Sequence, residues 1–259
     1  MNFFQAIIIA IVEGITEFLP ISSTGHMVIA QNLLGVESTD FVKAFTVNIQ
    51  FGAILSVIVL YWKRFFQSIN FYLKLAVACL PLGIAFLLEK QVDAMLSSVM
   101  IVAVSMFIGG IVLLFVDKWF TTSEEDEIEL TYLNAFLIGL FQILAIIPGV
   151  SRSAATIVGG MSRKLSRKTA AEFSFFLAVP TMFAASALKL FENYHSIHTE
   201  DIKLLVIGNV ISFLVAMIAI KTFIDFLTKH GFKMFGWYRI VVGLIIIVLL
   251  LSGQKLSVL

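Results

Sequence analysis

Long apolar stretches, separated by short charged segments, make up most of this sequence. They run through residues 44–62, 65–88, 94–116, 130–151, 173–188, 204–220 and 240–254, and each contains few or no charged side chains. A helix that crosses a membrane requires about 20 mostly apolar residues. The pattern therefore predicts an all-α protein that crosses the membrane several times.

Two segments, residues 2–35 and 130–160, do not fit a single crossing. The first is interrupted at Pro20 and the second at Pro148 and Gly149. The piece that follows each interruption is too short and polar to cross a bilayer alone. Because non-helical backbone at membrane depth persists only inside protein or beside a water-filled cavity, we expect both segments to be re-entrant helix–loop–helix hairpins.

The two halves of the chain are related by an offset of 128 positions. This offset places Pro20 on Pro148, Ser23 on Ser151 and Phe45 on Phe173. We interpret residues 1–259 as a single membrane domain of two repeats, about 1–118 and 131–259, joined by an acidic connector at about 119–130. Each repeat would hold one hairpin and three crossings, about ten helices in all. Because three is odd, the second repeat would enter from the opposite side, which is an inverted-topology arrangement.

Composition supports the membrane assignment and excludes other classes. The 259 residues are 59% hydrophobic and 14% charged, with a mean hydropathy of +1.00, whereas soluble domains are about 25% charged. A net charge of +1 provides no basic surface for nucleic acid. The one cysteine, Cys79, cannot form an internal disulfide. We therefore expect neither a soluble enzyme nor a nucleic-acid binder.

Basic residues indicate which side of the membrane is cytoplasmic. The predicted crossings place twelve on one side, namely Lys63, Arg64, Lys74, Lys118, Arg163, Lys164, Arg167, Lys168, Lys221, Lys229, Lys233 and Arg239. The side that holds both termini has five, namely Lys43, Lys90, Lys189, Lys203 and Lys255. By the positive-inside rule we expect both termini, and the opening of the first hairpin, to lie outside. The start of the chain has no basic region or small-residue cleavage site, so we expect no cleavable signal peptide.

Glu13 and Glu17 are four residues apart and so share one face of a helix. A charge at the centre of a bilayer costs about 2.5–3.5 kcal/mol on insertion scales, and such residues are functional by default. Two carboxylates with phosphate oxygens suit Mg²⁺ or Ca²⁺, which prefer oxygen ligands. We expect a divalent-cation site here; the alternative is a pair of carboxylates that reach toward the membrane surface.

Hydroxyl residues and a histidine follow Pro20 directly: Ser22, Ser23, Thr24 and His26. The hydroxyls can cap a helix that starts here, and capping alone is the simpler interpretation. His26, however, lies one helical turn beyond Ser23. A hydroxyl within reach of an imidazole is the usual arrangement for activating a weak nucleophile, so we expect these residues to serve catalysis.

Ser151, Arg152 and Ser153 form a similar cluster after the second interruption, and Thr156 lies one turn further on. Helix N-termini bind anions through their N–H groups, and an arginine fork matches phosphate oxygens. We expect Arg152 to bind phosphate. The alternative is an ion pair between Arg152 and Glu13 or Glu17, from which the arginine could exchange partners when an anion arrives.

Asn48 and Gln50 lie inside the first long apolar stretch. Buried amides there either bond a neighbouring helix or line the site, and the sequence leaves both interpretations open. The chain has no GxxxxGK[ST], GxGxxG or HExxH motif, so nucleotide-binding and zinc-hydrolase functions lack support.

Together these residues predict a phosphatase that acts on a lipid diphosphate. The arginine and helix N-termini suit an anion, and carboxylates next to an anion require a cation. The competing class is an anion transporter, because inverted repeats with paired broken helices are typical of transporters. The serine, histidine and carboxylate cluster favours hydrolysis, because anion transport requires none of it.

The stretch from Glu13 to His26, EGITEFLPISSTGH, strongly resembles the first signature of the bacterial undecaprenyl-diphosphate phosphatases, the bacitracin-resistance family. The stretch 148–156, PGVSRSAAT, resembles their second, and residues 172–180 and 48–52 also match. Type-2 phosphatidic acid phosphatases also use a Ser-Gly-His and a Ser-Arg element. Their distal histidine has no equivalent here, so we set that family aside.

The resemblance implies a multi-pass enzyme of the bacterial inner membrane whose active cleft faces the outer side. Such enzymes use a divalent cation to convert undecaprenyl diphosphate to undecaprenyl phosphate and inorganic phosphate. They thereby recycle the lipid carrier for cell-wall synthesis and confer bacitracin resistance. Substrate and membrane lipids would be the partners, and the sequence leaves a homodimer open.

The same resemblance assigns roles residue by residue. Glu13 and Glu17 would be the metal-site residues, Ser23 and His26 the candidates for nucleophile and base, and Arg152 the phosphate clamp. The signatures do not decide between Ser23 and His26 as the nucleophile. The expected substrate-binding residues are Ser22, Thr24, Ser151, Ser153, Thr156 and Gln50.

Overall fold

The computed structural model describes residues 1–66, 69–84, 88, 95, 98–120, 128–193, 195, 198–254 and 256. These residues form ten α-helices and short 3₁₀ turns, with no strand in the described part of the chain. The helices are α1 (Phe3–Thr16), α2 (Ser23–Leu33), α3 (Asp40–Leu60), α4 (Ile69–Cys79), α7 (Val99–Trp119), α8 (Tyr132–Ile143), α9 (Arg152–Ser162), α10 (Arg167–Asn193), α11 (Ile202–His230) and α12 (Lys233–Leu251). The prediction of an all-α fold is confirmed.

Five of these helices, α3, α7, α10, α11 and α12, are long and apolar enough to cross a membrane. Large apolar side chains stay exposed along them, including Ile108 on α7 and Ile218 on α11. Such a surface is favourable in lipid and unfavourable in water. The protein is therefore a multi-pass membrane protein, as the apolar pattern predicts. The acidic residues 124–127 of the predicted connector lie outside the described residues.

Local sequence determines where several of these helices begin. Asn2 accepts a hydrogen bond from the backbone N–H of Gln5, whose side chain accepts one from the backbone N–H of Asn2. Thr39 caps α3, and Thr131 caps α8, through the same kind of side-chain bond to a free N–H group. Polar residues just before α1, α3 and α8 thus stabilise the starts of these helices.

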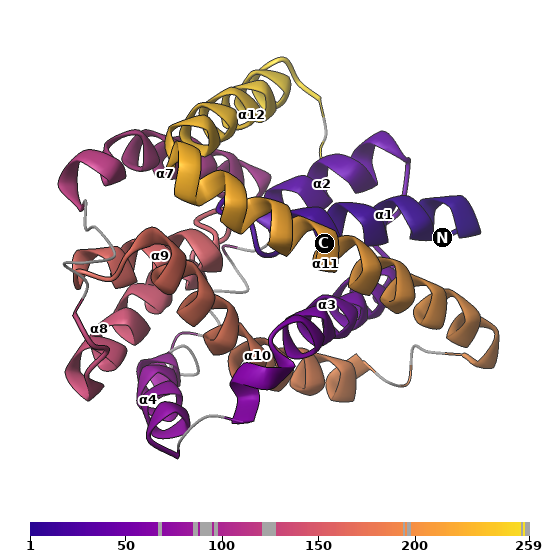
Figure 1. The fold of residues 1–259 in the computed structure, drawn as a ribbon. Helices are drawn as coiled ribbons and strands as arrows, with labels where there is room; N and C mark the ends of the chain where they lie inside the picture. Colours follow the sequence, from indigo (N-terminus) through magenta and orange to yellow (C-terminus); the bar gives the residue numbers. More distant parts are fainter. Residues whose placement is uncertain are drawn as a thin grey trace.

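Two pairs of short helices, α1 with α2 and α8 with α9, form hairpins around the predicted interruptions. Figure 1 shows the first pair at the right and the second at the left. Ser22 caps α2 and Ser151 caps α9, so the hairpins correspond at an offset of 129. The predicted offset of 128 is one residue short here, because it aligns Ser151 with Ser23 instead of Ser22.

The open ends of the two hairpins lie at opposite faces of the molecule. Gln5 of α1 donates to the Leu34 carbonyl after α2, and an apolar cluster joins this end to the start of α11. At the other face Arg163, after α9, donates to Asn134 of α8. The long helix α11 runs between these two faces (Figure 1). The hairpins thus enter the helix bundle from opposite sides.

The structure corrects the placement of one basic residue. Arg239 was expected in a cytoplasmic connection, but it lies within α12 and is fully buried. The apolar pattern misses it because α12 begins at Lys233, seven residues before the predicted crossing at 240. Helix α12 packs along α7, and these two helices lie side by side at the upper left of Figure 1.

Candidate active site

The interrupted loops of the two hairpins touch each other. Ser153 donates to the carbonyl of Phe18 at 2.6 Å, and Ser151 donates to the carbonyl of Leu19 at 3.5 Å. The loop after α1 is thereby attached to the start of α9. Both hairpins consequently contribute to one site, although their sequences are more than 120 residues apart.

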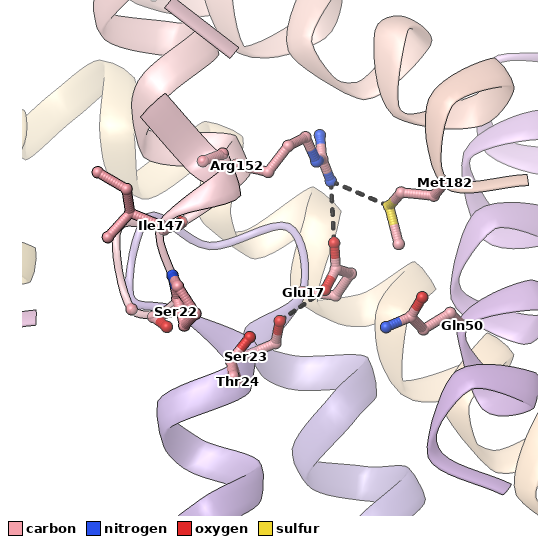
Figure 2. Close-up of a pocket in the computed structure, with 12 residues that line it drawn as sticks. Glu17, Ser22, Ser23, Thr24, Gln50, Ile147, Arg152 and Met182 are labelled. Atoms are coloured by element: carbon pink, nitrogen blue, oxygen red, sulfur yellow. Dashed lines mark hydrogen bonds and ion pairs between the residues drawn. The ribbon is translucent and has the colours of Figure 1, made fainter. Parts of the chain in front are cut away.

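A cavity of about 170 Å³ lies where the loops meet. It is lined by Glu17, Ser22, Ser23, Thr24, Gln50, Ala145, Ile147, Pro148, Gly149, Ser151, Arg152 and Met182. The structure thus brings most of the predicted site residues to one place, as Figure 2 shows for those it labels. Glu13, His26, Ser153 and Thr156 are not among the lining residues.

Glu17 joins the two hairpins electrostatically. One carboxylate oxygen accepts from Arg152 Nη2 at 3.1 Å, and the other accepts from the Ser23 hydroxyl at 2.7 Å. Figure 2 shows Glu17 between these two partners, with Gln50 beside them. The ion pair that the sequence offers as an alternative is therefore present. It is made by residues that line the cavity, so an incoming anion has direct access to it.

Arg152 is held by further contacts from α10. Its Nη1 donates to the carbonyl of Ser174 at 3.0 Å, and its Nη2 lies 3.4 Å from the sulfur of Met182. The guanidinium also lies 5.7 Å from the centre of the Phe18 ring, which is within cation–π range. These contacts fix the guanidinium, so that its Nη2 group lies beside the cavity residues Glu17 and Met182.

Ser174 is a site residue that the sequence did not indicate. Its hydroxyl lies 2.6 Å from that of Thr156, which also donates to the carbonyl of Arg152. Thr156 therefore supports Arg152 from behind and does not face the cavity. The sequence does place a hydroxyl residue inside the run Phe173 to Phe176, but an apolar run of this kind is typical of helices that pack together without any role in a site.

Glu13 lies one turn before Glu17 and is 1% exposed. Its Oε1 atom is buried and has no hydrogen-bond partner among the described residues. A buried carboxylate oxygen without a partner is unfavourable, and a cation would satisfy it. The donor chemistry of Glu13 and Glu17 therefore fits a divalent ion that binds oxygen. Within the described part of the chain no group of three or more His, Cys, Asp and Glu side chains forms a metal cluster.

His26 has partners other than Ser23. Its Nδ1 lies 2.7 Å from the carbonyl oxygen of Ser22, and its Nε2 lies 2.7 Å from the Tyr238 hydroxyl. Because a carbonyl only accepts, Nδ1 carries the proton and Nε2 of the neutral ring accepts from Tyr238. The predicted contact between Ser23 and His26 is replaced by one between Ser23 and Glu17. Tyr238, which stacks on the imidazole, is a second residue that the sequence did not indicate.

The two amides of α3 separate into different roles. Gln50 lines the cavity and accepts from Ser186 of α10 at 2.9 Å. Asn48 accepts a hydrogen bond from Asn209 of α11, whose side-chain oxygen accepts from the N–H of Gly52. Both interpretations left open by the sequence therefore apply to Gln50, which lines the site and bonds a neighbouring helix, whereas Asn48 bonds a neighbouring helix and is not among the lining residues.

The arrangement suits phosphoryl transfer. It combines a fixed guanidinium, a hydroxyl held against a carboxylate, and the N-termini of α2 and α9, where backbone N–H groups favour anions. Apolar residues such as Ile147 and Met182 line the same cavity. The site can thus accept a group that is anionic at one end and apolar at the other.

Comparison with known proteins agrees with this chemistry. The family model described as bacitracin resistance protein BacA matches residues 6–245. A protein of Flavobacterium psychrophilum, named undecaprenyl-diphosphatase, is 60% identical over 255 residues, which cover 96% of each chain. A protein with the same name from Porphyromonas gingivalis is 56% identical, and the match covers 100% of each chain. Another, from Aquifex aeolicus, is 46% identical, and the match covers 95% of this chain and 97% of the relative.

Proposed function

This chain belongs to the bacitracin resistance protein BacA family, and from that premise we propose that it hydrolyses undecaprenyl diphosphate to undecaprenyl phosphate and inorganic phosphate. The reaction recycles the lipid carrier for cell-wall synthesis, and bacitracin resistance follows from it. The observation that carries this proposal is the Ser23–Glu17–Arg152 chain of contacts inside a cavity built by both hairpins. Hydrolysis requires this combination, whereas anion transport does not.

Ser23 is the nucleophile in this proposal. Its oxygen attacks the terminal phosphorus, the bond from that phosphorus to the bridging oxygen breaks, and undecaprenyl phosphate leaves. Glu17 takes the hydroxyl proton, because its carboxylate already accepts the Ser23 hydrogen bond. Water then attacks the phosphoserine, which releases inorganic phosphate and restores the serine.

Arg152 exchanges partners during the reaction. Before substrate binds, its Nη2 donates to Glu17. A diphosphate that enters the cavity presents oxygens that match the guanidinium fork, and charge-assisted bonds to them stabilise the negative charge of the transition state. The exchange releases Oε1 of Glu17 from Arg152, while Oε2 keeps its hydrogen bond to the Ser23 hydroxyl and takes the proton.

Glu13 and Glu17 would hold a divalent cation, Mg²⁺ or Ca²⁺, in this proposal. The support is the unpartnered buried Oε1 of Glu13 and the oxygen-only donor set. When bound, the ion would neutralise phosphate charge. Ser22, Thr24, Ser151 and Gln50 contact the phosphates from the cavity wall, whereas Ser153 and Thr156 stabilise the loops behind it.

His26 supports the N-cap of α2 in this scheme, because its Nδ1–H bonds the carbonyl of Ser22. The active cleft opens to the outer side of the bacterial cell membrane, since the α1–α2 hairpin enters from the face that carries few basic residues.

The test is release of inorganic phosphate by the purified protein supplied with undecaprenyl diphosphate in detergent. We expect one phosphate per lipid, loss of release with a chelator, and recovery with Mg²⁺ or Ca²⁺. Folded protein that releases no phosphate with either ion would contradict the proposed activity. Release that is unaffected by a chelator would contradict the cation assignment alone.

A further inference from the structure

Arg239 is a buried residue that the scheme above does not use. It lies on α12, a helix that contributes no residue to the lining of the cavity. Its side chain is 0% exposed, which is exceptional for a guanidinium. No carboxylate among the described residues forms an ion pair with it. Its charge is stabilised by backbone carbonyl groups instead.

The five hydrogen bonds of Arg239 reach three separate segments. Nη1 donates to Pro20 O at 3.1 Å and to Val150 O at 2.9 Å, so that one nitrogen bridges the two interrupted loops. Nη2 donates to Gly149 O at 2.8 Å. The remaining bonds, from Nη2 and Nε, anchor the guanidinium to the carbonyls of Ser105 and Met106 on α7.

The bonded carbonyls lie next to the caps on which the site depends. Val150 directly precedes Ser151, and Pro20 comes two residues before Ser22. Both cap serines have positive φ angles, 72° for Ser22 and 74° for Ser151. Residues with a β-carbon seldom adopt this conformation, and it persists only where the surroundings enforce it. Arg239 supplies that enforcement to both loops through one planar group.

We propose that Arg239 is a positioning residue for the hydrolysis, and that its guanidinium sets the separation and orientation of the two loops that hold Ser23 and Arg152. It touches neither the substrate nor the reacting atoms. The inference rests on the proposed phosphatase activity of this site. Its physical basis is that reacting groups misplaced by about 1 Å lose much of their rate, and that five donors in a rigid fork cannot be replaced by an ammonium group.

The first test compares Arg239→Gln and Arg239→Lys with wild type in kcat and KM for phosphate release. We expect Arg239→Gln to lower kcat by about 100-fold with KM changed by less than about threefold, since the groups that bind the lipid are retained. Arg239→Lys keeps the charge and some donors, so it should recover part of kcat. Arg163→Gln is the matched control, because Arg163 bonds Asn134 at the far end of α9, and we expect wild-type kcat.

A second variant moves Arg239 without replacing it. A β-carbon added at Gly109 of α7 would overlap the Arg239 guanidinium at Nη2. Gly109→Ala therefore displaces the group and keeps its charge, while alanine favours the helix more than glycine does. We expect kcat to fall at least tenfold, with KM again retained. Gly83→Ala is the control, because no described atom lies within 4 Å of its added β-carbon.

The outcomes separate the inference from the activity on which it rests. Wild-type protein without phosphatase activity would remove the proposed function. An active wild type, with Arg239→Gln or Gly109→Ala folded and at wild-type kcat, would overturn the positioning role. If Arg239→Gln does not fold, Gly109→Ala decides. A folded Gly109→Ala protein with reduced kcat and retained KM supports the proposal, and loss of folding in both variants overturns it in favour of a purely structural role.

Discussion

At the scale of single residues, the contacts of Ser23 and His26 show what helical spacing can and cannot predict. The one-turn separation suggested a serine–histidine pair. However, side chains on a helix lean toward its N-terminus, so Ser23, the first residue of α2, leans toward the loop and bonds Glu17. His26 leans back to the carbonyl of Ser22. The sequence predicts which residue types the site contains. It does not predict their partners, because Ser23 bonds a residue at the end of α1, across a turn, and His26 contacts α12, which is distant in the sequence.

The nucleophile assignment leads to a prediction for two alanine variants. Ser23→Ala should fall to background phosphate release, because the attacking oxygen is lost. His26→Ala should lower the rate of phosphate release about 10- to 100-fold and retain measurable turnover. It removes a side chain that supports the loop, but the reacting oxygen of Ser23 is still present. The measurements are phosphate release and rapid quench after mixing with substrate labelled in its terminal phosphate, in acid to preserve phosphoserine and in base to preserve phosphohistidine. A trapped acid-labile phosphohistidine, or substantial turnover by Ser23→Ala, would contradict the assignment.

Arg152 leads to a second prediction at this scale. Arg152→Lys should lose about 100-fold or more in kcat, close to the loss in Arg152→Ala. A lysine keeps the charge but cannot donate to Glu17 and to the Ser174 carbonyl from one planar group. The measurement is kcat for phosphate release, with Arg167→Lys as the control because Arg167 pairs with Asp117 outside the site. An Arg152→Lys enzyme near wild type would mean that only the positive charge matters.

At the scale of elements, the two hairpins were predictable from their interruptions, but their register was not. Proline at 20 and at 148 suggested an offset of 128, whereas the caps correspond at 129. The second loop contains Gly149 with φ of 93° where the first contains residue 21. The local sequence identifies where a helix is interrupted. The number of residues in the loop between the two helices depends on what packs against that loop.

The packing of that loop predicts a difference between two glycine variants. Gly149 and Gly35 both have positive φ, 93° and 61°, so alanine should cost about 1–2 kcal/mol at either. At Gly149 an added β-carbon would also overlap the Val102 carbonyl, whereas at Gly35 no described atom lies within 4 Å. We expect Gly149→Ala to lower the melting temperature more and to abolish phosphate release, and Gly35→Ala to stay active. Equal melting shifts would show that the loop can move away from α7.

At the scale of the whole molecule, the ends of several helices meet at the same face, as the apolar pattern predicts. Asp117, at the end of α7, bonds Arg167 at the start of α10 and the N–H of Phe232 between α11 and α12. These three segments carry most of the basic residues that were counted on one side. The inverted repeat itself stays a prediction, and the entry of the hairpins from opposite faces agrees with it. Arg239, Tyr238 and Ser174 could not be predicted, because only tertiary packing brings them to the site.

The sorted faces lead to a prediction of orientation. The apolar pattern predicts twelve basic residues on one side of the membrane and five on the other, and leaving out the buried Arg239 makes this eleven against five. By the positive-inside rule, this excess predicts that the Asp117 face lies in the cytoplasm. In a Cys79→Ser background, we expect Ser38→Cys, exposed between α2 and α3, to react with a membrane-impermeant thiol reagent on intact cells. Lys229→Cys, exposed near the end of α11, should react only after permeabilisation.

Each labelled variant should first be shown to release phosphate, so that labelling reports the active fold. Parent Cys79→Ser protein provides the background signal. The inverse pattern, with Lys229→Cys labelled on intact cells and Ser38→Cys protected, would place the α1–α2 hairpin on the cytoplasmic side. Because that hairpin supplies Ser23 and Glu17, the cleft would then face the cytoplasm, and the outward-facing site proposed here would be wrong. Labelling of both variants on intact cells would show leaky cells, which a cytoplasmic marker protein detects independently.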